Sequence, residues 1–203
     1  MSFSEQKYKI VRNFLNKEMI IFLKNYVKLF EDRLYKEKPI TKEKPYPFQD
    51  DLVDRCFSWY GGFHTDSLLM SYRDKVAKIV KKDLAESYSY HRTYYHGSKL
   101  MPHIDRKSCE YSVSVCINKE DIDWPLYLHT LQDDILSIEL NDGDALIYQG
   151  TKMKHWRNEY FGKQHTQFFL HYIDKNNIFY PKYMLDGRNS LGTEGLKYGA
   201  WNE

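Results

Sequence analysis

The stretch Tyr94-Tyr95-His96-Gly97-Ser98-Lys99-Leu100-Met101-Pro102-His103-Ile104-Asp105 ends in a His-x-Asp pair. In an extended strand, residues two apart point to the same side, so His103 and Asp105 can reach one ion while Ile104 turns away. A third candidate, His155, follows fifty positions after Asp105. Two imidazoles and one carboxylate on one face of a ferrous ion leave positions open for oxygen chemistry. We therefore predict one iron site made by His103, Asp105 and His155.

The chain around this stretch has the period of a β protein. From residue 88 onward, short segments rich in Tyr, Val, Ile and Phe alternate with turn residues. The predicted strands are 88–95, 111–117, 126–131, 135–140, 145–149 and 164–173. Asp142-Gly143 is a strong hairpin signal, because this pair accepts the positive backbone angles of a tight turn. Many short strands at near-regular spacing predict a barrel or a sandwich.

The N-terminal part has a different period. Residues 7–11 predict a short strand, and Asn16 is a suitable cap for a helix over 17–36, where apolar residues recur at steps of three and four. A second helix is predicted over 66–85, capped by Thr65 or Asp66. The prolines and glycines of 38–62 predict a loop, which we interpret as a candidate lid over the mouth of the barrel.

Length and composition bound the remaining possibilities. The 203 residues, 42% of them apolar and 16% aromatic, suit one domain with a real core. A formal net charge of +2 gives no indication of a nucleic acid or membrane partner. Three cysteines without a close pair, and a polar start without a signal-peptide core, predict a cytoplasmic protein. The richness in Lys, Tyr and Asn is compatible with a virus- or phage-encoded chain.

We expect a single domain over 1–203. Its parts are helical support over about 1–87, a β core over about 88–175 and a covering tail over 176–203. Helices packed outside a β-barrel are the simplest arrangement of these parts.

The combined motif resembles one known family. Tyr94-x-x-Gly97-x-x-Leu100-x-x-His103-x-Asp105, then Gly143-Asp144-Ala145-Leu146-Ile147-Tyr148 and then His155, are similar to the prolyl 4-hydroxylase-like branch of the iron(II)/2-oxoglutarate-dependent dioxygenases. The strand Cys109-Glu110-Tyr111-Ser112-Val113-Ser114-Val115 looks like the strand that follows the metal pair there. Trp124-Pro125-Leu126-Tyr127 and Phe169-Leu170-His171-Tyr172 look like small microbial and viral members. The resemblance covers about 88–175.

The resemblance implies a mainly β fold with flanking α-helices: a double-stranded β-helix, or jelly-roll and cupin-like barrel, with the N-terminal helices outside. It implies Fe(II), 2-oxoglutarate and O2 as cofactors, with ascorbate as a reductant. The implied reaction hydroxylates a C–H bond and releases succinate and CO2. A prolyl residue is one substrate that this branch suggests, and the substrate class, peptide or small molecule, stays open.

The residues for the cosubstrate are less clearly marked. The family's basic residue for the far carboxylate of 2-oxoglutarate lies about ten positions after the second histidine, where this chain has His165. Arg157 is the rival, because a guanidinium fork matches a carboxylate better than an imidazole does. Tyr94 resembles, by motif position, the tyrosine that hydrogen-bonds the cosubstrate.

Strand parity extends this set of candidate residues. Residues 165, 167, 169 and 171 share one face of the last strand, so His165 and Gln167 should line the cavity. The same parity places His171 towards the mouth. We predict that His171 and Trp156 contact the substrate.

Two alternatives remain at this point. The missing Lys or Arg at position 165 supports a catalytically inactive jelly-roll binding module, whereas the presence of all three metal ligands counts against it. The same oxygenase chemistry could also act on a small metabolite or a nucleobase. A halide-using relative is disfavoured, because the carboxylate of Asp105 fills the place of the halide. No motif identifies the substrate or the oligomeric state.

Overall fold

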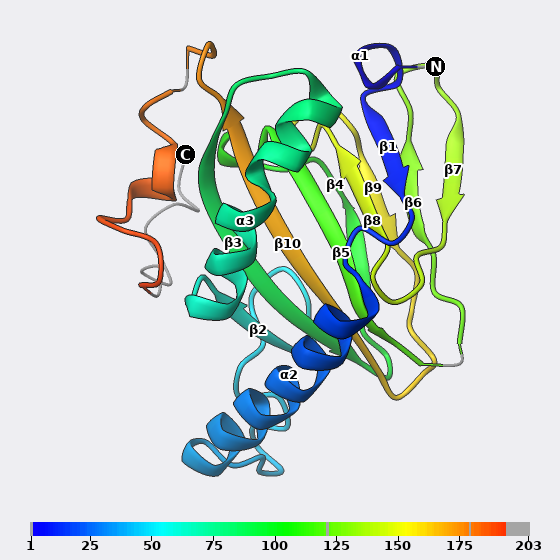
Figure 1. The fold of residues 1–203 in the computed structure, drawn as a ribbon. Coiled ribbons are helices and arrows are strands. Elements are labelled where there is room, and N and C mark those ends of the chain that lie inside the picture. Colours follow the sequence, from blue (N-terminus) through cyan, green and yellow to red (C-terminus); the bar gives the residue numbers. More distant parts are fainter. Residues whose placement is uncertain (1, 121, 179, 194–203) are drawn as a thin grey trace.

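The computed structural model describes residues 2–120, 122–178 and 180–193, which form two antiparallel sheets with helices on the outer side of the larger one (Figure 1). The larger sheet has the order β1-β8-β5-β10-β3-β2 and the smaller one the order β4-β9-β6-β7. Every hydrogen-bonded pair of strands in these two orders is antiparallel. The predicted mainly β jelly-roll fold with helices outside is confirmed, and its two sheets are hydrogen-bonded separately.

The larger sheet consists of β1 (Tyr8–Val11), β2 (Cys56–Tyr60), β3 (Leu84–Tyr95), β5 (Tyr111–Lys119), β8 (Ala145–Tyr148) and β10 (Gln164–Asp174). The smaller sheet consists of β4 (Leu100–His103), β6 (Leu126–His129), β7 (Ile135–Ile138) and β9 (His155–Arg157). The helices are α1 (Phe3–Gln6), α2 (Lys17–Glu37) and α3 (Phe63–Val80), with 3-10 turns η1 (Lys107–Cys109) and η2 (Met184–Gly187).

Strand alternation in the larger sheet separates two cores. In β5, Val113, Val115 and Ile117 belong to the core under the helices, while Cys116 belongs to the core between the sheets. In β10, Phe168 and Leu170 face the helices. Because successive side chains of a strand point to opposite faces, the intervening residues of both strands point into the space between the sheets. The candidate site lies in that inner space.

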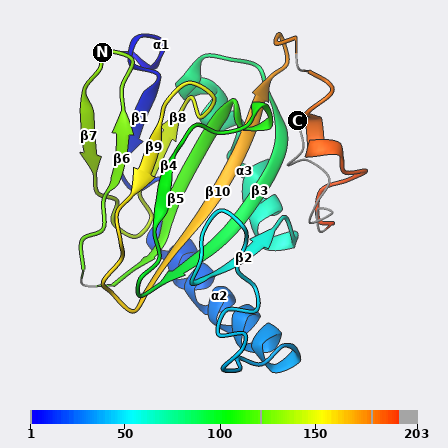
Figure 2. The same ribbon diagram turned by 180° about the vertical axis from the view of Figure 1, so that it is seen from behind.

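The helices cover the outer face of the larger sheet, and the two opposite views of Figures 1 and 2 agree on this. The predicted start of α2 at Asn16 is confirmed, since its side chain accepts a hydrogen bond from the amide of Met19 at 2.9 Å. The apolar stripe of α2 buries Ile20, Leu23, Val27 and Leu34. No helix in the part of the chain that the structure describes combines the length and apolar character needed to cross a bilayer.

Several predicted boundaries are wrong. The second helix spans Phe63–Val80 instead of 66–85, and its cap is Gly62, which has a φ of 99°. Residues 84–87 join β3, because this long strand is covered on both faces and lacks a simple alternation. The predicted loop 38–62 contains β2, whose Phe57 is fully buried.

The described part of the predicted tail lies against the β core. Asp186 accepts hydrogen bonds from Arg106 at 2.7 and 2.5 Å and from the hydroxyl of Tyr60. Arg188 forms an ion pair with Asp66 of α3 at 2.8 Å. Residues 194–203 of the expected covering tail lie outside the described residues.

A buried histidine in the first turn of α3 makes the free energy of unfolding depend on pH. His64 stacks on Tyr26 and packs against the tilted ring of Phe30, and neither of its ring nitrogens has a hydrogen-bond partner among the described residues. Burial lowers the pKa of His64 from 6.5 to about 3. As the pH falls below 6.5, His64 binds a proton in the unfolded chain and stays neutral in the folded chain. The free energy of unfolding therefore falls by up to about 1.4 kcal/mol per pH unit.

We expect His64→Phe to flatten this dependence. Urea unfolding of the wild type should show a lower free energy of unfolding at pH 5 than at pH 7, and the variant should lose a smaller part of it. His96→Gln is the control, because its ring is exposed and should leave the slope unchanged. A variant with the full wild-type slope would contradict the assignment to His64.

Candidate metal centre

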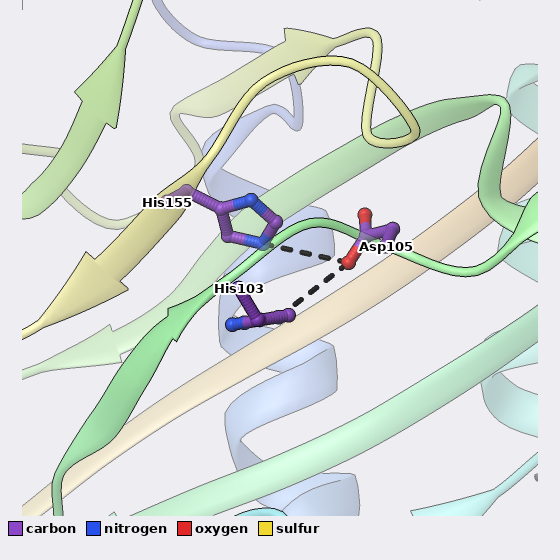
Figure 3. A group of neighbouring side chains, drawn as sticks. All are labelled: His103, Asp105 and His155. Atoms are coloured by element: carbon purple, nitrogen blue, oxygen red, sulfur yellow. Dashed lines mark ion pairs between the residues drawn. The ribbon is translucent and has the colours of Figure 1, made fainter.

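The three predicted ligands come from two paired strands and the segment that follows one of them. His103 of β4 lies opposite His155 of β9 in the register of the smaller sheet. Asp105 follows β4, and its amide donates a hydrogen bond to the carbonyl of Gly150 at 3.0 Å. Figure 3 shows the two rings and the carboxylate pointing toward one another. The strand pairing therefore brings together two histidines, His103 and His155, that are far apart in the sequence.

The ligand atoms are close enough to share one ion. Asp105 Oδ1 lies 3.6 Å from His103 Nε2 and 3.5 Å from His155 Nε2 (Figure 3). One ligand atom from each of the three residues lies within 4.8 Å of the others. The side chain of His103 is 23% exposed and that of His155 only 4%, so solvent reaches the group from the side of His103.

Backbone carbonyls orient both imidazoles in the same way. His103 Nδ1 lies 2.8 Å from the carbonyl oxygen of Met101, and His155 Nδ1 lies 3.0 Å from that of Met153. A carbonyl only accepts, so each Nδ1 donates its proton to the backbone, and each Nε2 is the nitrogen turned toward Asp105. Metal-binding histidines characteristically have such a hydrogen bond on the other ring nitrogen.

The protonation states of Asp105 and His155 suit a cation. Burial acts to lower the pKa of His103, but Asp105 outweighs it and raises that pKa, so a metal would displace a proton from this ring. Burial acts to raise the pKa of Asp105, but His155 and the hydrogen bond from His103 outweigh it and hold that pKa below its usual range. Burial lowers the pKa of His155. An ionised carboxylate and a neutral imidazole are the forms that bind a metal.

Ser112 and Gly150 position the second carboxylate oxygen of Asp105, Oδ2. Ser112 of β5 donates its hydroxyl to Asp105 Oδ2 at 2.8 Å, and its oxygen lies 3.0 Å from Nδ1 of His171. Gly150 leaves the necessary space, because a Cβ there would collide with Asp105 Oδ2 and lie 2.6 Å from the oxygen of Ser112. These contacts fix the direction in which the carboxylate points.

Arg157 lies two residues beyond His155 on the same inner face of β9. Its guanidinium is buried, donates to the carbonyl oxygen of Trp124 and lies 4.6 Å from the ring of Trp124. No acidic side chain among the described residues lies within 4.0 Å of it. Burial lowers the pKa of Arg157, yet an arginine in a protein stays charged. A buried cation without a counter-charge is costly, so this position is suited to an anionic ligand.

His165 and Gln167 lie beside Arg157 and line, together with Trp124, the same small pocket. Ser114 donates to Gln167 Oε1 at 2.5 Å, and Gln167 Nε2 lies 2.8 Å from His165 Nε2. The amide thus donates to the imidazole, which carries its proton on Nδ1. Burial, followed by the charge of Arg157, lowers the pKa of His165 well below 6.5, so this ring is neutral.

The hydroxyl of Tyr94 and the Nδ1 of His165 are buried and have no partner among the described residues. Tyr94 is fully buried and packs edge-on against Trp124, with ring centroids 4.8 Å apart. Two buried polar atoms without partners thus lie near a cation without a counter-charge, so this pocket is suited to a polar, anionic ligand.

The two predicted substrate contacts lie elsewhere. His171, expected at the mouth, is instead buried behind Asp105, where it stacks on Tyr88 with ring centroids 4.4 Å apart. Trp156 alternates with His155 and Arg157, so its ring is on the opposite face of β9 and stacks on Tyr127. The expected position of His171 towards the mouth is wrong, and Trp156 lies on the face of β9 that points away from the metal ligands.

Three residues of the site were not predicted from the sequence. Ser112 and Gly150 position Asp105, and Trp124 holds Arg157. The alternation in Tyr111-Ser112-Val113-Ser114-Val115 does carry a signal, since it puts small polar residues on the inner face. Gly150 has no such signal, because its role depends on the approach of Asp105 in three dimensions.

No model of a known protein family and no curated protein sequence matches the chain. Solved structures do. A prolyl-4-hydroxylase from Pseudomonas putida has a TM-score of 0.62 and 12% identity, covering 85% of this chain and 95% of that chain. A Trichoplax adhaerens prolyl hydroxylase in complex with a peptide fragment of the hypoxia inducible factor has a TM-score of 0.62 and 14% identity, covering 85% and 86%.

HygX from Streptomyces hygroscopicus, with nickel, 2-oxoglutarate and hygromycin B bound, has a TM-score of 0.62 and 10% identity, covering 86% of this chain and 85% of that chain. At such identities the likeness establishes the fold. The chain has the fold of the prolyl 4-hydroxylases and of other 2-oxoglutarate and Fe(II) oxygenases, as the motif led us to expect.

We expect Ser112→Ala to weaken metal binding by about tenfold or more, the usual effect of removing a hydrogen bond to a ligand. Titration with Mn(II) or Fe(II) measures this. Ser114→Ala is the matched control, because Ser114 lies two residues along the same face of β5 and donates to Gln167 instead. Equal metal affinity in the two variants would contradict the role of Ser112.

Proposed function

We propose that the chain is an Fe(II)- and 2-oxoglutarate-dependent dioxygenase that hydroxylates a C–H bond of its substrate. The observation that carries the proposal is the convergence of His103 Nε2, His155 Nε2 and Asp105 Oδ1, with both Nδ1 atoms already used by backbone carbonyls. Two imidazoles and one carboxylate with an open side are the donor set of iron oxygenases. The fold of the chain is also the fold of such enzymes.

The buried polar groups fit 2-oxoglutarate. Arg157 is the better candidate for the far carboxylate, because its charge is permanent and His165 is neutral. The hydroxyl of Tyr94 and the Nδ1–H of His165 are donors without partners, and each can add a hydrogen bond to the same carboxylate. One cation facing one carboxylate leaves no buried net charge.

When bound, iron and 2-oxoglutarate supply the oxygen chemistry: one oxygen atom of O2 enters the substrate as hydroxyl and the other enters succinate, while the first carbon leaves as CO2. The chain positions these groups. His103, His155 and Asp105 would hold the metal, and Ser112 keeps the carboxylate aligned. Arg157 would fix the far end of the cosubstrate, and Trp124 and Tyr160 exclude water around it.

A peptidyl proline and a small molecule are both candidate substrates. Two similar structures are prolyl hydroxylases, one of them in complex with a peptide, and a third has hygromycin B bound. The open side at His103 is compatible with either.

We expect the protein, supplied with ferrous iron, 2-oxoglutarate and ascorbate, to form succinate even without a substrate. Asp105→Ala should abolish this turnover and the binding of iron, because it removes the only anionic ligand of the three. Unchanged succinate formation in the variant would contradict the metal assignment. A wild type that forms no succinate and does not bind 2-oxoglutarate would instead indicate a binding module.

Arg157→Ala and His165→Ala should separate the two candidate anchors. Loss of a buried charge pair costs 2 kcal/mol or more, so we expect Arg157→Ala to raise the 2-oxoglutarate concentration for half-maximal turnover by about 30-fold or more. His165→Ala removes one neutral hydrogen bond and should raise it by about fivefold. Arg33→Ala is the control, since its side chain is 78% exposed. A larger effect from His165→Ala would reverse the assignment.

A further inference from the structure

A tyrosine hydroxyl lies against one of the three metal ligands. Tyr148 ends β8 and is buried in the core between the two sheets. Its hydroxyl oxygen lies 3.3 Å from Nε2 of His155, and the two rings meet edge-on with centroids 4.9 Å apart. Nε2 is also the nitrogen of His155 that faces Asp105 in Figure 3, so the hydroxyl and the carboxylate approach the same ligand atom.

The other ring nitrogen decides the direction of this hydrogen bond. Nδ1 of His155 donates to the carbonyl oxygen of Met153, so Nε2 of the neutral ring is an acceptor. A tyrosine hydroxyl carries its proton at neutral pH and is the donor of the pair. In the metal-free chain, Tyr148 therefore occupies the lone pair of His155 that a metal ion would need.

A metal ion and the hydroxyl of Tyr148 compete for this lone pair. An imidazole nitrogen has one lone pair, and a metal ion takes it at a distance of about 2 Å. Binding of the metal therefore releases the hydroxyl, while the burial of Tyr148 and the pairing of β8 with β1 and β5 keep the ring in place. A buried donor without an acceptor is unfavourable, so the released hydroxyl needs a new partner.

Two acceptors can replace Nε2 of His155. Ser112 lies opposite Tyr148 in the register of β5 and β8, but its hydroxyl already donates to Asp105 and contacts Nδ1 of His171. The second acceptor is an oxygen atom bound to the metal itself. Because the hydroxyl of Tyr148 approaches a ligand atom, it lies next to the groups that would complete the coordination of the ion.

Tyr148 is also close to the pocket suited to an anion. Tyr94, whose hydroxyl has no partner among the described residues, belongs to the same buried cluster as Tyr148. Tyr148 is close enough to Arg157 to act on the pKa of that guanidinium. A ligand that extends from Arg157 to the metal would thus have its metal-bound end beside the hydroxyl of Tyr148.

We propose that Tyr148 couples the binding of the metal to the binding of the cosubstrate. Its hydroxyl occupies Nε2 of His155 in the metal-free chain, and in the loaded chain it donates to a metal-bound oxygen atom of 2-oxoglutarate. The inference rests on the proposed function, because it concerns the same metal and the same cosubstrate. The hydroxyl of Tyr148 therefore stabilises the metal when the cosubstrate is present.

The strengths of the successive hydrogen bonds give this coupling its sign. A bond from the hydroxyl to a neutral imidazole and a bond to a metal-bound water are both bonds to a neutral acceptor. A bond to an anionic carboxylate oxygen is roughly twice as strong. Exchange of His155 for water therefore changes the free energy little, and exchange of water for 2-oxoglutarate is favourable. By linkage, the cosubstrate raises the affinity for the metal by the factor by which the metal raises the affinity for the cosubstrate.

Titration of the full chain with Mn(II), with and without 2-oxoglutarate, measures this coupling through the EPR signal of the free ion. We expect Tyr148→Phe, which keeps the ring, to bind Mn(II) alone within about twofold of the wild type. With saturating 2-oxoglutarate, the variant should bind Mn(II) about fivefold more weakly than the wild type, the loss that corresponds to one hydrogen bond. The affinity of the Mn(II)-loaded chain for 2-oxoglutarate should fall by the same factor.

Tyr172→Phe is the matched control. Tyr172 is a buried tyrosine of the same sheet, and its hydroxyl donates to the carbonyl oxygen of Leu69 at 2.7 Å on the helix side, so both affinities should stay unchanged. A second readout does not depend on affinity. Zn(II) added with 2-oxoglutarate should give a near-ultraviolet tyrosine difference spectrum in the wild type and in Tyr172→Phe, and this spectrum should be lost in Tyr148→Phe. Its absence from the wild type would overturn the exchange of partners without any variant.

Failure of this inference can be distinguished from failure of the proposed function. A wild type that does not bind Mn(II), or whose affinity for Mn(II) is independent of 2-oxoglutarate, would contradict the proposed function and the inference with it. Coupling that Tyr148→Phe retains in full would overturn the inference alone and leave the released hydroxyl with Ser112. Binding of Mn(II) alone that is fivefold tighter in Tyr148→Phe would also overturn it, because the hydroxyl would then only compete with the metal.

Discussion

The carboxylate of Asp105 is the group on which the candidate site depends. Burial by itself would favour its neutral form, and the two imidazoles and the hydroxyl of Ser112 reverse that preference. Its two oxygens have separate partners, with Oδ1 turned to the histidines and Oδ2 held by Ser112. This division requires three distant segments to meet: the end of β4, the strand β5 and the bend at Gly150. The position of the Asp105 carboxylate, and with it the chemistry of the site, therefore depends on the packing of the two sheets.

The amino-acid sequence predicted the strand pattern where one face of a strand differs from the other. The alternation of 111–117 identified β5, and the Asn16 cap with its apolar stripe identified α2. Prediction failed where both faces are buried, as at the start of β3, or where functional side chains replace the apolar ones. The short strands β4 and β9 are of the second kind, since their inner faces carry His103, His155 and Arg157.

The sequence predicted which residues lie near one another in the candidate site better than it predicted where their side chains point. Parity along β10 correctly puts His165 and Gln167 on the inner face. It could not reveal that His171 would be covered by Tyr88, or that Arg157 would be enclosed by Trp124, because both facts depend on the partner sheet. The choice between Arg157 and His165 also needs burial, since the charge of an imidazole depends on its surroundings and that of a guanidinium does not.

The two faces of strand β10 have different roles, one in packing against the helices and the other in lining the candidate site. Its even-numbered residues from Thr166 to Tyr172 face the helices, and its odd-numbered residues from His165 to His171 face the site. A shift of one residue in its pairing would exchange the two sets. The histidines would then lie in the apolar core under the helices, and Phe168 and Leu170 would lie beside the metal ligands. A register shift of β10 would therefore impair both the folding of the chain and the function of the site, and selection for either acts against it. Along this strand, inherited variation should accordingly fall into two alternating stripes, one limited by packing and the other by chemistry.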